Sequence, residues 1–401
     1  MRPLEGITVL ELGRVLACPF AGMIMAELGA RVIKLEHPRG GDETRSYEPF
    51  ADGDSDRQGE RSAYFYACNR SKESVTVNFK SAEGQVLVRD LARHADVVIE
   101  NFPTGALKRY GLDYQALEPI NPALVYLSCT GFGQYGPLSS RKGYDTVFQA
   151  MSGLMGLTGE AGRGPVKAGL PVADLTSGLW IAIAALSALI GRQQTGRGAF
   201  VDMSMLDGQV SLLTLAAARY FALGEVPERL GTEHPGRVPS ATFACADGGH
   251  VHITGADQHW MPLCRALEIE GWGADPRFAD NSSRVSHRDE IMPELARAIA
   301  RWSRDTVIAK LDAHGVPSGP VRDIDEVLSD AHTQARQMVR EFDHPVAGAF
   351  KGLPLPFKFD GFDQPGFARP PLLGEHTNAV LANLLGYDTA RISGLKQEGV
   401  I

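Results

Sequence analysis

One carboxylate, Asp174, stands between a flexible turn and a long apolar segment, where a side chain can carry out covalent chemistry. Gly169 and Pro171 interrupt the chain just before it, and the apolar run from Leu179 predicts about three turns of helix. We expect Asp174 at or near the start of this helix, where backbone N–H groups and the helix dipole favour negative charge. They could hold the carboxylate or an oxyanion formed on it. Because Asp is a preferred N-cap residue, local sequence alone favours capping over catalysis.

The elements before Asp174 alternate between strands and helices, which predicts a parallel sheet of the doubly wound α/β class. A helix is expected from Ser81 to about 94, and another ends at Arg109. Strands are expected at 7–12, 31–36, 74–79, 95–100, 124–128 and 196–204. Ligands of such sheets bind at the carboxyl ends of the strands. The first strand is followed by a single glycine, so a Gly-x-Gly-x-x-Gly dinucleotide site is not predicted.

At Gly224 the alternation of strands and helices gives way to a loop-like stretch. Residues 241–254 predict a hairpin around Asp247-Gly248-Gly249, and helices are expected at about 257–267 and 286–314. From about 317 the chain is expected to return to the first folding unit through a segment rich in Pro and Gly. Two folding units are expected in 401 residues, because single cores stop growing at roughly 250–300 residues.

Composition narrows the class of protein. A net charge of −8 argues against a general nucleic-acid or membrane-surface binder. The N-terminus lacks the apolar core of a signal peptide, and no apolar run is expected to span a bilayer, so we expect a soluble, cytoplasmic protein. The five cysteines are scattered and never paired as Cys-x-x-Cys, which indicates reduced, partly buried thiols and no zinc site.

Eight short motifs follow one another along nearly the whole chain. Besides Asp174 in its loop, they are Leu-Glu-Gly-Ile-Thr-Val-Leu-Glu-Leu (4–12), Leu-Gly-Ala-Arg-Val-Ile-Lys-Leu-Glu (28–36), Gly-Gly-Asp-Glu-Thr-Arg (40–45), Val-Ile-Glu-Asn-Phe (98–102), Gly-Phe-Gly-Gln-Tyr-Gly-Pro (131–137), Thr-Gly-Arg-Gly (195–198) and Pro-Leu-Leu-Gly-Glu-His-Thr (371–377). In this order they resemble the CoA-transferases of the CaiB/BaiF type, or family III. The resemblance implies a large Rossmann-like α/β domain built from both chain ends (1–223 and 321–401), a smaller α+β domain (224–320), and a homodimer whose protomers interlock like rings.

The resemblance aligns Asp174 with the catalytic aspartate of that family. It implies that this carboxylate attacks a thioester carbonyl, giving a mixed anhydride and CoA thiolate, and that an aspartyl-CoA thioester follows. An acceptor carboxylate then takes the CoA through a second anhydride. A CoA thioester is thus a substrate, and neither a metal nor a permanently bound cofactor is implied. N–H groups at the helix start and in the glycine-containing loops are alternative sites for the oxyanions.

The same resemblance implies positions that contact CoA. The family often has Arg just after the second strand, whereas this chain has His37 there, with Arg39 close by. Basic residues are needed locally for the nucleotide phosphates because the protein is acidic overall. The expected contacts are Val15, Ala17, Arg39, Asn101, Phe102, Arg109 and Lys142.

The segment 229–239 resembles the branch that transfers CoA from succinyl-CoA to small dicarboxylates such as glutarate, 3-hydroxy-3-methylglutarate, malate, mesaconate or itaconate. Arg14, His234 and Arg237 could pair with the acceptor carboxylate that does not react. His234 could equally be a loop-packing residue. Gly248 and Gly249 could form a loop that shields intermediates, although a hairpin turn is favoured.

Two other functions stay open from sequence. Racemases of 2-methylacyl-CoA thioesters share the fold and use a His at the position of Tyr144. A tyrosine, with a reference pKa of about 10, is a poor base near neutral pH, which favours transfer over racemisation. A CoA-binding protein without turnover is the third possibility, and the intact Asp174 loop argues against it.

Overall fold

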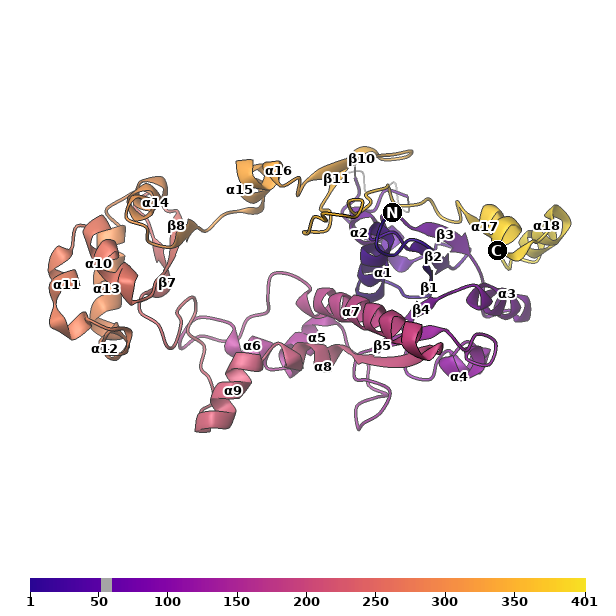
Figure 1. The fold of residues 1–401 in the computed structure, drawn as a ribbon, viewed down its shortest axis with the longest axis horizontal. Coiled ribbons are helices and arrows are strands. Elements are labelled where there is room, and N and C mark those ends of the chain that lie inside the picture. Colours follow the sequence, from indigo (N-terminus) through magenta and orange to yellow (C-terminus); the bar gives the residue numbers. More distant parts are fainter. Residues whose placement is uncertain (52–59) are drawn as a thin grey trace. The chain divides into compact units, whose positions relative to one another are not determined.

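The computed structural model describes residues 1–51 and 60–401 and divides into two compact units (Figure 1). Unit 1 comprises residues 1–154, 167–218 and 331–401, and unit 2 comprises residues 155–166 and 219–330. The chain therefore passes from unit 1 to unit 2 and back twice. We describe each unit by itself.

Unit 1 is built on a six-stranded sheet with the order β3-β2-β1-β4-β5-β6, in which all neighbouring strands are parallel. This confirms the predicted parallel sheet. The expected β2 range is correct to the residue, and the other strands shift by a few residues at their ends. The strands are β1 (Thr8–Glu11), β2 (Arg31–Glu36), β3 (Glu73–Thr76), β4 (Val97–Glu100), β5 (Val125–Thr130) and β6 (Ala199–Ser204).

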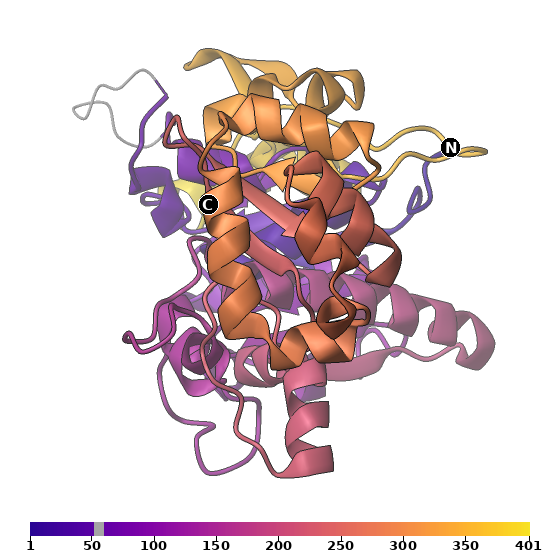
Figure 2. The same ribbon diagram turned by 90° about the vertical axis from the view of Figure 1, so that its left-hand side faces the viewer.

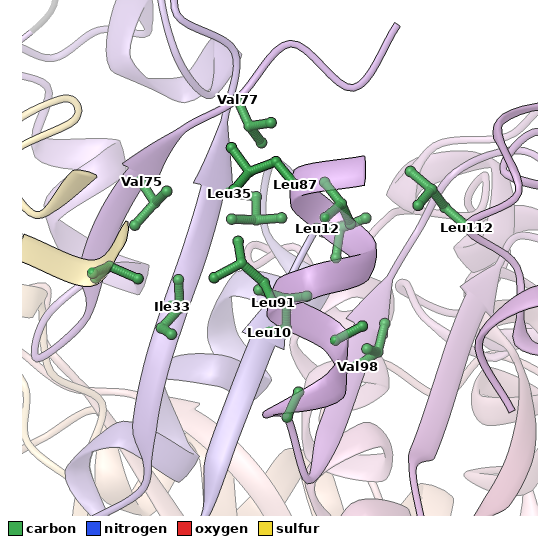
Figure 3. Packing of buried hydrophobic residues seen from close by; sticks show 14 of the residues in the cluster. Leu10, Leu12, Ile33, Leu35, Val75, Val77, Leu87, Leu91, Val98 and Leu112 are labelled. Carbon is green, nitrogen blue, oxygen red and sulfur yellow. The ribbon is translucent and has the colours of Figure 1, made fainter. Parts of the chain in front are cut away.

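Helix α3 (Ala82–Arg93) covers one face of this sheet, together with α17 (Thr377–Leu385) and α18 (Thr389–Gln397). Figure 3 shows Leu87 and Leu91 of α3 packed against Leu10, Ile33 and Val98 of the strands. Because side chains alternate along a strand, every second strand residue joins this core. The predicted N-cap is confirmed, since the hydroxyl of Ser81 accepts the N–H of Gly84 at 3.1 Å.

Helices α1 (Ala17–Glu27) and α7 (Val172–Thr195) cover the opposite face. Their close packing depends on Gly178, where a Cβ would lie 2.8 Å from the carbonyl oxygen of Ala17. By length and composition α7 could cross a membrane, which corrects the expectation that no apolar segment is long enough. Here its buried side packs against α1, β5 and β6.

Other parts of unit 1 depart from the predicted helices. The helix expected to end at Arg109 is only a single 3₁₀ turn, η2 (Lys108–Tyr110). The apolar residues after the sixth strand predict one helix to about Leu223, whereas the structure has two helices there. The polar and charged residues 37–62 predict a long surface loop, and residues 52–59 of that range lie outside the described residues. The remaining elements outside unit 2 are η1 (Glu43–Ser46), α2 (Ala63–Cys68), α4 (Tyr114–Leu117), α5 (Asp145–Met151), α6 (Leu154–Leu157), α8 (Met205–Ser211), α9 (Thr214–Leu223), α16 (Ala331–Ala335), β10 (Arg340–His344) and β11 (Gly348–Gly352), some of which cross a unit boundary.

Unit 2 contains an antiparallel sheet, in the order β7-β8-β9, and a set of short helices. The predicted hairpin is confirmed: its turn holds Gly248 at φ +82°, a conformation that suits glycine. The helices, coloured red to orange in Figure 2, pack around a core that includes Trp260 and Phe278. The elements are β7 (Ser240–Ala244), β8 (His250–Thr254), β9 (Ser318–Pro320), α10 (Asp257–Ala266), α11 (Glu270–Ala274), η3 (Pro276–Phe278), α12 (Asn281–Ser286), α13 (Arg288–Ile299), α14 (Arg304–Ala313) and α15 (Ile324–Ser329).

Candidate active site

Asp174 lies in the first turn of α7, as expected, at the third helical residue. The N-cap position belongs to Pro171, which has no side-chain donor or acceptor to offer. Among the residues that the structure describes, the carboxylate of Asp174 has neither a hydrogen-bond donor nor a cation as a partner. The capping alternative for Asp174 is therefore wrong, and its carboxylate is left without a structural role.

Another acid caps this helix. Oδ1 of Asp145, at the start of α5, accepts the backbone N–H groups of Ala173 at 2.8 Å and Asp174 at 3.2 Å. The side chain of Gln149, one turn later in α5, donates to Oδ2 of Asp145 at 2.6 Å. Two elements that are distant in sequence are thus joined at the residue of interest.

The remaining N–H groups of this turn are also engaged. Val172 donates its N–H to the carbonyl oxygen of Leu170 at 2.8 Å, and Leu175 donates to that of Pro171 at 3.0 Å. The N–H groups of residues 172–174, which a helix start usually leaves without a partner inside the helix, are therefore all occupied, and Pro171 at the N-cap has no N–H. Of the two alternatives for the oxyanion site, this geometry disfavours the helix start and leaves the glycine-containing loops.

The electrostatic surroundings of Asp174 oppose its ionisation. Burial, and then the nearby charge of Asp145, raise the pKa of Asp174 to about 7. The charge of Asp174 also acts on Tyr64 of α2. Burial, followed by this charge, raises the pKa of Tyr64 to about 12. The tyrosine is therefore a neutral hydroxyl at physiological pH. A carboxylate with a raised pKa and without a counter-ion is more basic than an exposed one, which suits nucleophilic attack.

An apolar cavity of about 430 Å³ lies beside the start of α7, where Pro171 and Leu175 line it. Tyr64 lines the same cavity, and residues of α1, α2 and the β10–β11 hairpin complete its walls. Phe342 and Phe350 contribute aromatic rings from that hairpin. The cavity offers a small carbon chain an apolar place next to the turn that carries Asp174.

A second cavity, of about 370 Å³, lies at the carboxyl ends of the strands, where the fold class predicts a ligand. Arg14, His37 and Phe102 line it, whereas Arg39 is exposed and outside its lining. The amide of Asn101 holds the backbone of Arg14 through two hydrogen bonds of 2.8–2.9 Å, and the Arg14 guanidinium lies 4.9 Å from the centre of the Phe102 ring. The structure thus brings together several of the predicted residues.

Sequence reasoning missed the groups that support this edge. Buried Glu100 accepts the N–H of Phe102 at 2.7 Å and the hydroxyl of Ser128, and burial raises the pKa of Glu100 to about 7. Lys80, which is exposed, lines the same cavity. Lys80 follows the predicted third strand, and that position was the available signal.

Val15 lies in the loop between β1 and α1, and Ala17 is the first residue of α1. Val15 adopts φ +68°, which is unusual for a β-branched residue, and its N–H points at the carboxylate of Asp42, 3.3 Å away. Asp42 is buried and forms an ion pair of 2.9 Å with Lys34. The strained conformation of the loop is therefore held by the carboxylate of Asp42, which is itself buried and paired with Lys34.

The other predicted residues are more dispersed. Arg109 and Lys142 are exposed in unit 1, and the Arg109 guanidinium lies 4.7 Å from the centre of the Tyr110 ring. His234 and Arg237 are exposed in unit 2, in the loop before β7. His234 accepts the N–H of Gly236 at 3.1 Å, a contact within its own loop.

Metal and thiol chemistry have no geometric support in the described part of the chain. No group of three or more His, Cys, Asp and Glu side chains is arranged there to hold a metal ion. All five cysteines are free and buried, as predicted, and burial, followed by a hydrogen bond with Cys129, raises the pKa of Cys18. A thiol in that environment is a weak nucleophile.

Comparison with known proteins gives matches over nearly the whole chain. Residues 4–377 match the model of CoA-transferase family III. A succinate–glutarate CoA-transferase of Agrobacterium fabrum is 40% identical over 95% of this chain and 96% of its own length. A succinyl-CoA:mesaconate CoA-transferase of Haloarcula marismortui is 35% identical over 97% of this chain and 98% of its own. The crystal structure of a CaiB/BaiF family protein from Brucella suis has a TM-score of 0.85 and 42% identity, and the match covers 96% of this chain and 99% of that one.

Proposed function

The chain belongs to CoA-transferase family III, and on this premise we propose that it transfers CoA from succinyl-CoA to a free dicarboxylate through covalent intermediates on Asp174. One observation carries the proposal: Asp174 is a partly buried carboxylate with a raised pKa and no counter-ion in the described structure, and an apolar cavity lies beside its helical turn.

The proposed reaction begins at the ionised carboxylate of Asp174. Its oxygen attacks the thioester carbonyl of the donor, the C–S bond breaks, and CoA leaves as the thiolate. The thiolate attacks the Asp174 carbonyl of the mixed anhydride, so that succinate leaves as a carboxylate and the aspartyl-CoA thioester remains. This exchange conserves the activation of the thioester and releases no proton.

The second half reverses these steps with another acid. An acceptor carboxylate attacks the aspartyl thioester, CoA thiolate leaves, and a new mixed anhydride forms. The thiolate then attacks the acceptor carbonyl of this anhydride, and the bond to the Asp174 oxygen breaks, which restores the carboxylate. The net result is a new acyl-CoA and an unchanged enzyme.

The cavity at the strand ends supports a CoA site there. Val15, Ala17, Asn101 and Phe102 are proposed to contact CoA; of these, Phe102 lines the cavity, together with Arg14. The position of Arg14 favours a contact with CoA over the acceptor role expected from sequence. Arg39, Arg109 and Lys142 remain proposed phosphate contacts, and as exposed cations each is free to turn toward an anion.

The acceptor is proposed to be a small dicarboxylate, because both named relatives act on acids of that kind. His234 and Arg237 are proposed to bind its non-reacting carboxylate. Arg237→Gln should raise the acceptor KM about tenfold with the donor KM unchanged, because one charge-assisted hydrogen bond is lost. An unchanged acceptor KM across glutarate, malate, mesaconate and itaconate would remove Arg237 from the site.

The chain is further proposed to be a homodimer with interlocked protomers, following the family resemblance. Exposed apolar side chains on α7 support a protein interface, because large apolar patches on soluble proteins mark interaction sites. Leu179, Ile183 and Ile190 expose 48%, 50% and 61% of their surface.

Mass spectrometry of the intact protein tests the proposed chemistry. After brief incubation with succinyl-CoA, the native chain should gain a covalent CoA adduct, and Asp174→Ala should gain none while still binding the donor. If Asp174→Ala transfers CoA at the native rate, Asp174 is not the nucleophile. Incorporation of solvent deuterium at the α-carbon of a 2-methylacyl-CoA would instead support the racemase alternative, for which Tyr144, 82% exposed at the N-cap of α5, is a poor base.

A further inference from the structure

The acid that caps α7 is the feature that the proposed chemistry does not use. Asp145 is partly buried, and in the described part of the chain no cation pairs with it. It nevertheless lies close enough to Asp174 to oppose the ionisation of that residue. Ser, Thr or Asn would cap a helix as well as Asp does, without placing a second negative charge beside the reacting group. Capping alone therefore does not explain the negative charge of Asp145.

Gln149 fixes the orientation of this acid. Its side-chain amide is fully buried: Nε2 donates to Oδ2 of Asp145 and to the carbonyl oxygen of Leu170 at 3.3 Å, while Oε1 accepts the N–H of Ala168 at 2.9 Å. Both amide atoms are thus used to tie α5 to the loop that enters α7. The other carboxylate oxygen of Asp145 is left facing the two N–H groups of the helix.

We propose that Asp145 is a positioning residue for the nucleophilic carboxylate of Asp174: it occupies the backbone N–H groups of Ala173 and Asp174 and keeps the reacting side chain free and poorly stabilised. The inference rests on the proposed role of Asp174. In an ordinary helix the N–H groups of the first turn attract acidic side chains and stabilise their charge. Here a second acid holds those groups, so the Asp174 carboxylate is available to attack.

The electrostatic effect acts in the same direction. Among the described residues, the groups whose charge interacts with Asp174 are Asp145 from α5 and Tyr64 from α2, and Tyr64 is neutral near pH 7. Burial, followed by Asp145, raises the pKa of Asp174, so Asp145 makes the ionised carboxylate more basic and more reactive. Asp145 accordingly has two separable effects: it caps the backbone N–H groups of α7, and it places a like charge beside Asp174.

Two substitutions separate these effects. Asp145→Asn keeps an oxygen that can accept the two N–H groups but removes the charge and the acceptor for Nε2 of Gln149, whereas Asp145→Ala removes the cap as well. Thr146→Ala serves as the matched control, because Thr146 is the next residue of α5 and is exposed. The measurements are the single-turnover rate of CoA adduct formation from succinyl-CoA, its pH dependence, and amide hydrogen exchange in residues 172–175.

For Asp145→Ala we expect adduct formation about 100-fold slower, since a small misplacement of a reacting group costs rates of this order. Amide exchange at 173 and 174 should accelerate, and donor affinity should stay within about threefold, as the CoA cavity is lined by other residues. For Asp145→Asn the exchange should stay slow, the rate should fall less than in Asp145→Ala, and the acidic limb of the pH profile should move to lower pH. A purely structural cap would not move that limb.

Native rates in Asp145→Ala, or an unmoved acidic limb in Asp145→Asn, would overturn the proposal. If Asp145→Ala fails to fold, the acidic limb of the pH profile and the amide hydrogen exchange of Asp145→Asn still test the proposal. Failure of the proposed function can be told apart from failure of the Asp145 proposal. If the proposed function is wrong, the native protein itself forms no CoA adduct, or Asp174→Ala remains active. The exchange measurement does not depend on turnover at all.

Discussion

At the scale of single residues, Asp174 and Asp145 form an acidic pair without a cation among the described residues. Such a pair destabilises the folded state when both members are ionised, because burial and like charge each oppose the second charge. Proteins retain such features mostly where a function requires them. The pair therefore marks the site independently of any comparison with relatives.

This argument predicts that Asp174→Asn stabilises the protein in a pH-dependent way. The folded-state pKa of about 7 lies above the usual value of 3.8, so the cost of ionising Asp174 is absent near pH 4, grows between pH 4 and 7, and is complete above pH 7. Asn is neutral throughout. At pH 8 the variant should be more stable by about 1–3 kcal/mol, at 1.4 kcal/mol per pKa unit with an allowance for partial exposure.

Thermal unfolding of both proteins at pH 8 and pH 4 checks this prediction. Asp207→Asn is the control, because Asp207 is the third residue of α8, as Asp174 is of α7, but is exposed. It should show no stabilisation, since an acid in a first turn favours the helix. An Asp174→Asn variant with no gain at pH 8, or with an equal gain at pH 4, would contradict the electrostatic reasoning.

At the scale of elements, the loop between β1 and α1 depends on β2 beneath it. Lys34, in β2, is fully buried, and its ammonium lies 3.0 Å from Glu11 and 2.9 Å from Asp42, the acid that faces the N–H of Val15. Burial lowers the pKa of Lys34, but the carboxylates of Asp42 and Glu11 outweigh this and raise it above its usual value. The loop proposed to bind CoA is thus anchored by an internal ion cluster.

Lys34→Met should therefore destabilise the protein by about 3–5 kcal/mol, because it leaves two buried carboxylates without this cation. It should also raise the KM for the acyl-CoA donor, because Asp42 no longer holds the loop. Arg31→Met is the matched control in the same strand: the Arg31 and Glu73 side chains of that pair are 37% and 30% exposed, so its loss should cost less than about 1 kcal/mol. Equal losses in urea unfolding would show that the buried cluster is not the anchor.

The strands and the first turn of α7 were predictable from sequence, and the capping network was not. β2 reads directly from its β-branched and apolar residues, and the turn at Pro171 indicates the start of α7. Asp145 contacts a turn 28–29 residues away, and that contact is set by how α5 packs on α7, which local patterns do not encode. The helix expected to end at Arg109 fails because only one short turn forms there. The role proposed for Asp174 came from the order of eight motifs, since its local sequence favours a cap.

At the scale of the whole molecule, the outer side of α7 remains to be explained. The helix has 24 residues and buries one side against the sheet layer, yet Leu179, Ile183 and Ile190 on its other side are about half exposed or more. These positions are separated by four and seven residues, so they follow one stripe of the helix. An apolar stripe of this kind on a protein surface predicts a partner, and the proposed partner is a second copy of the chain.

Sedimentation should accordingly give twice the chain mass, and interlocked protomers should not separate on dilution to nanomolar concentration, because separation would require unfolding. Ile183→Asp places a charge in the stripe and should lower the fraction of dimer that assembles when the unfolded chain is refolded, since burying an unpaired carboxylate costs several kcal/mol. Lys396→Asp changes charge at an exposed position of α18 and should leave the dimer intact. A native protein that sediments as a single chain would refute the dimer. A dimer that dissociates on dilution would refute only the interlocking.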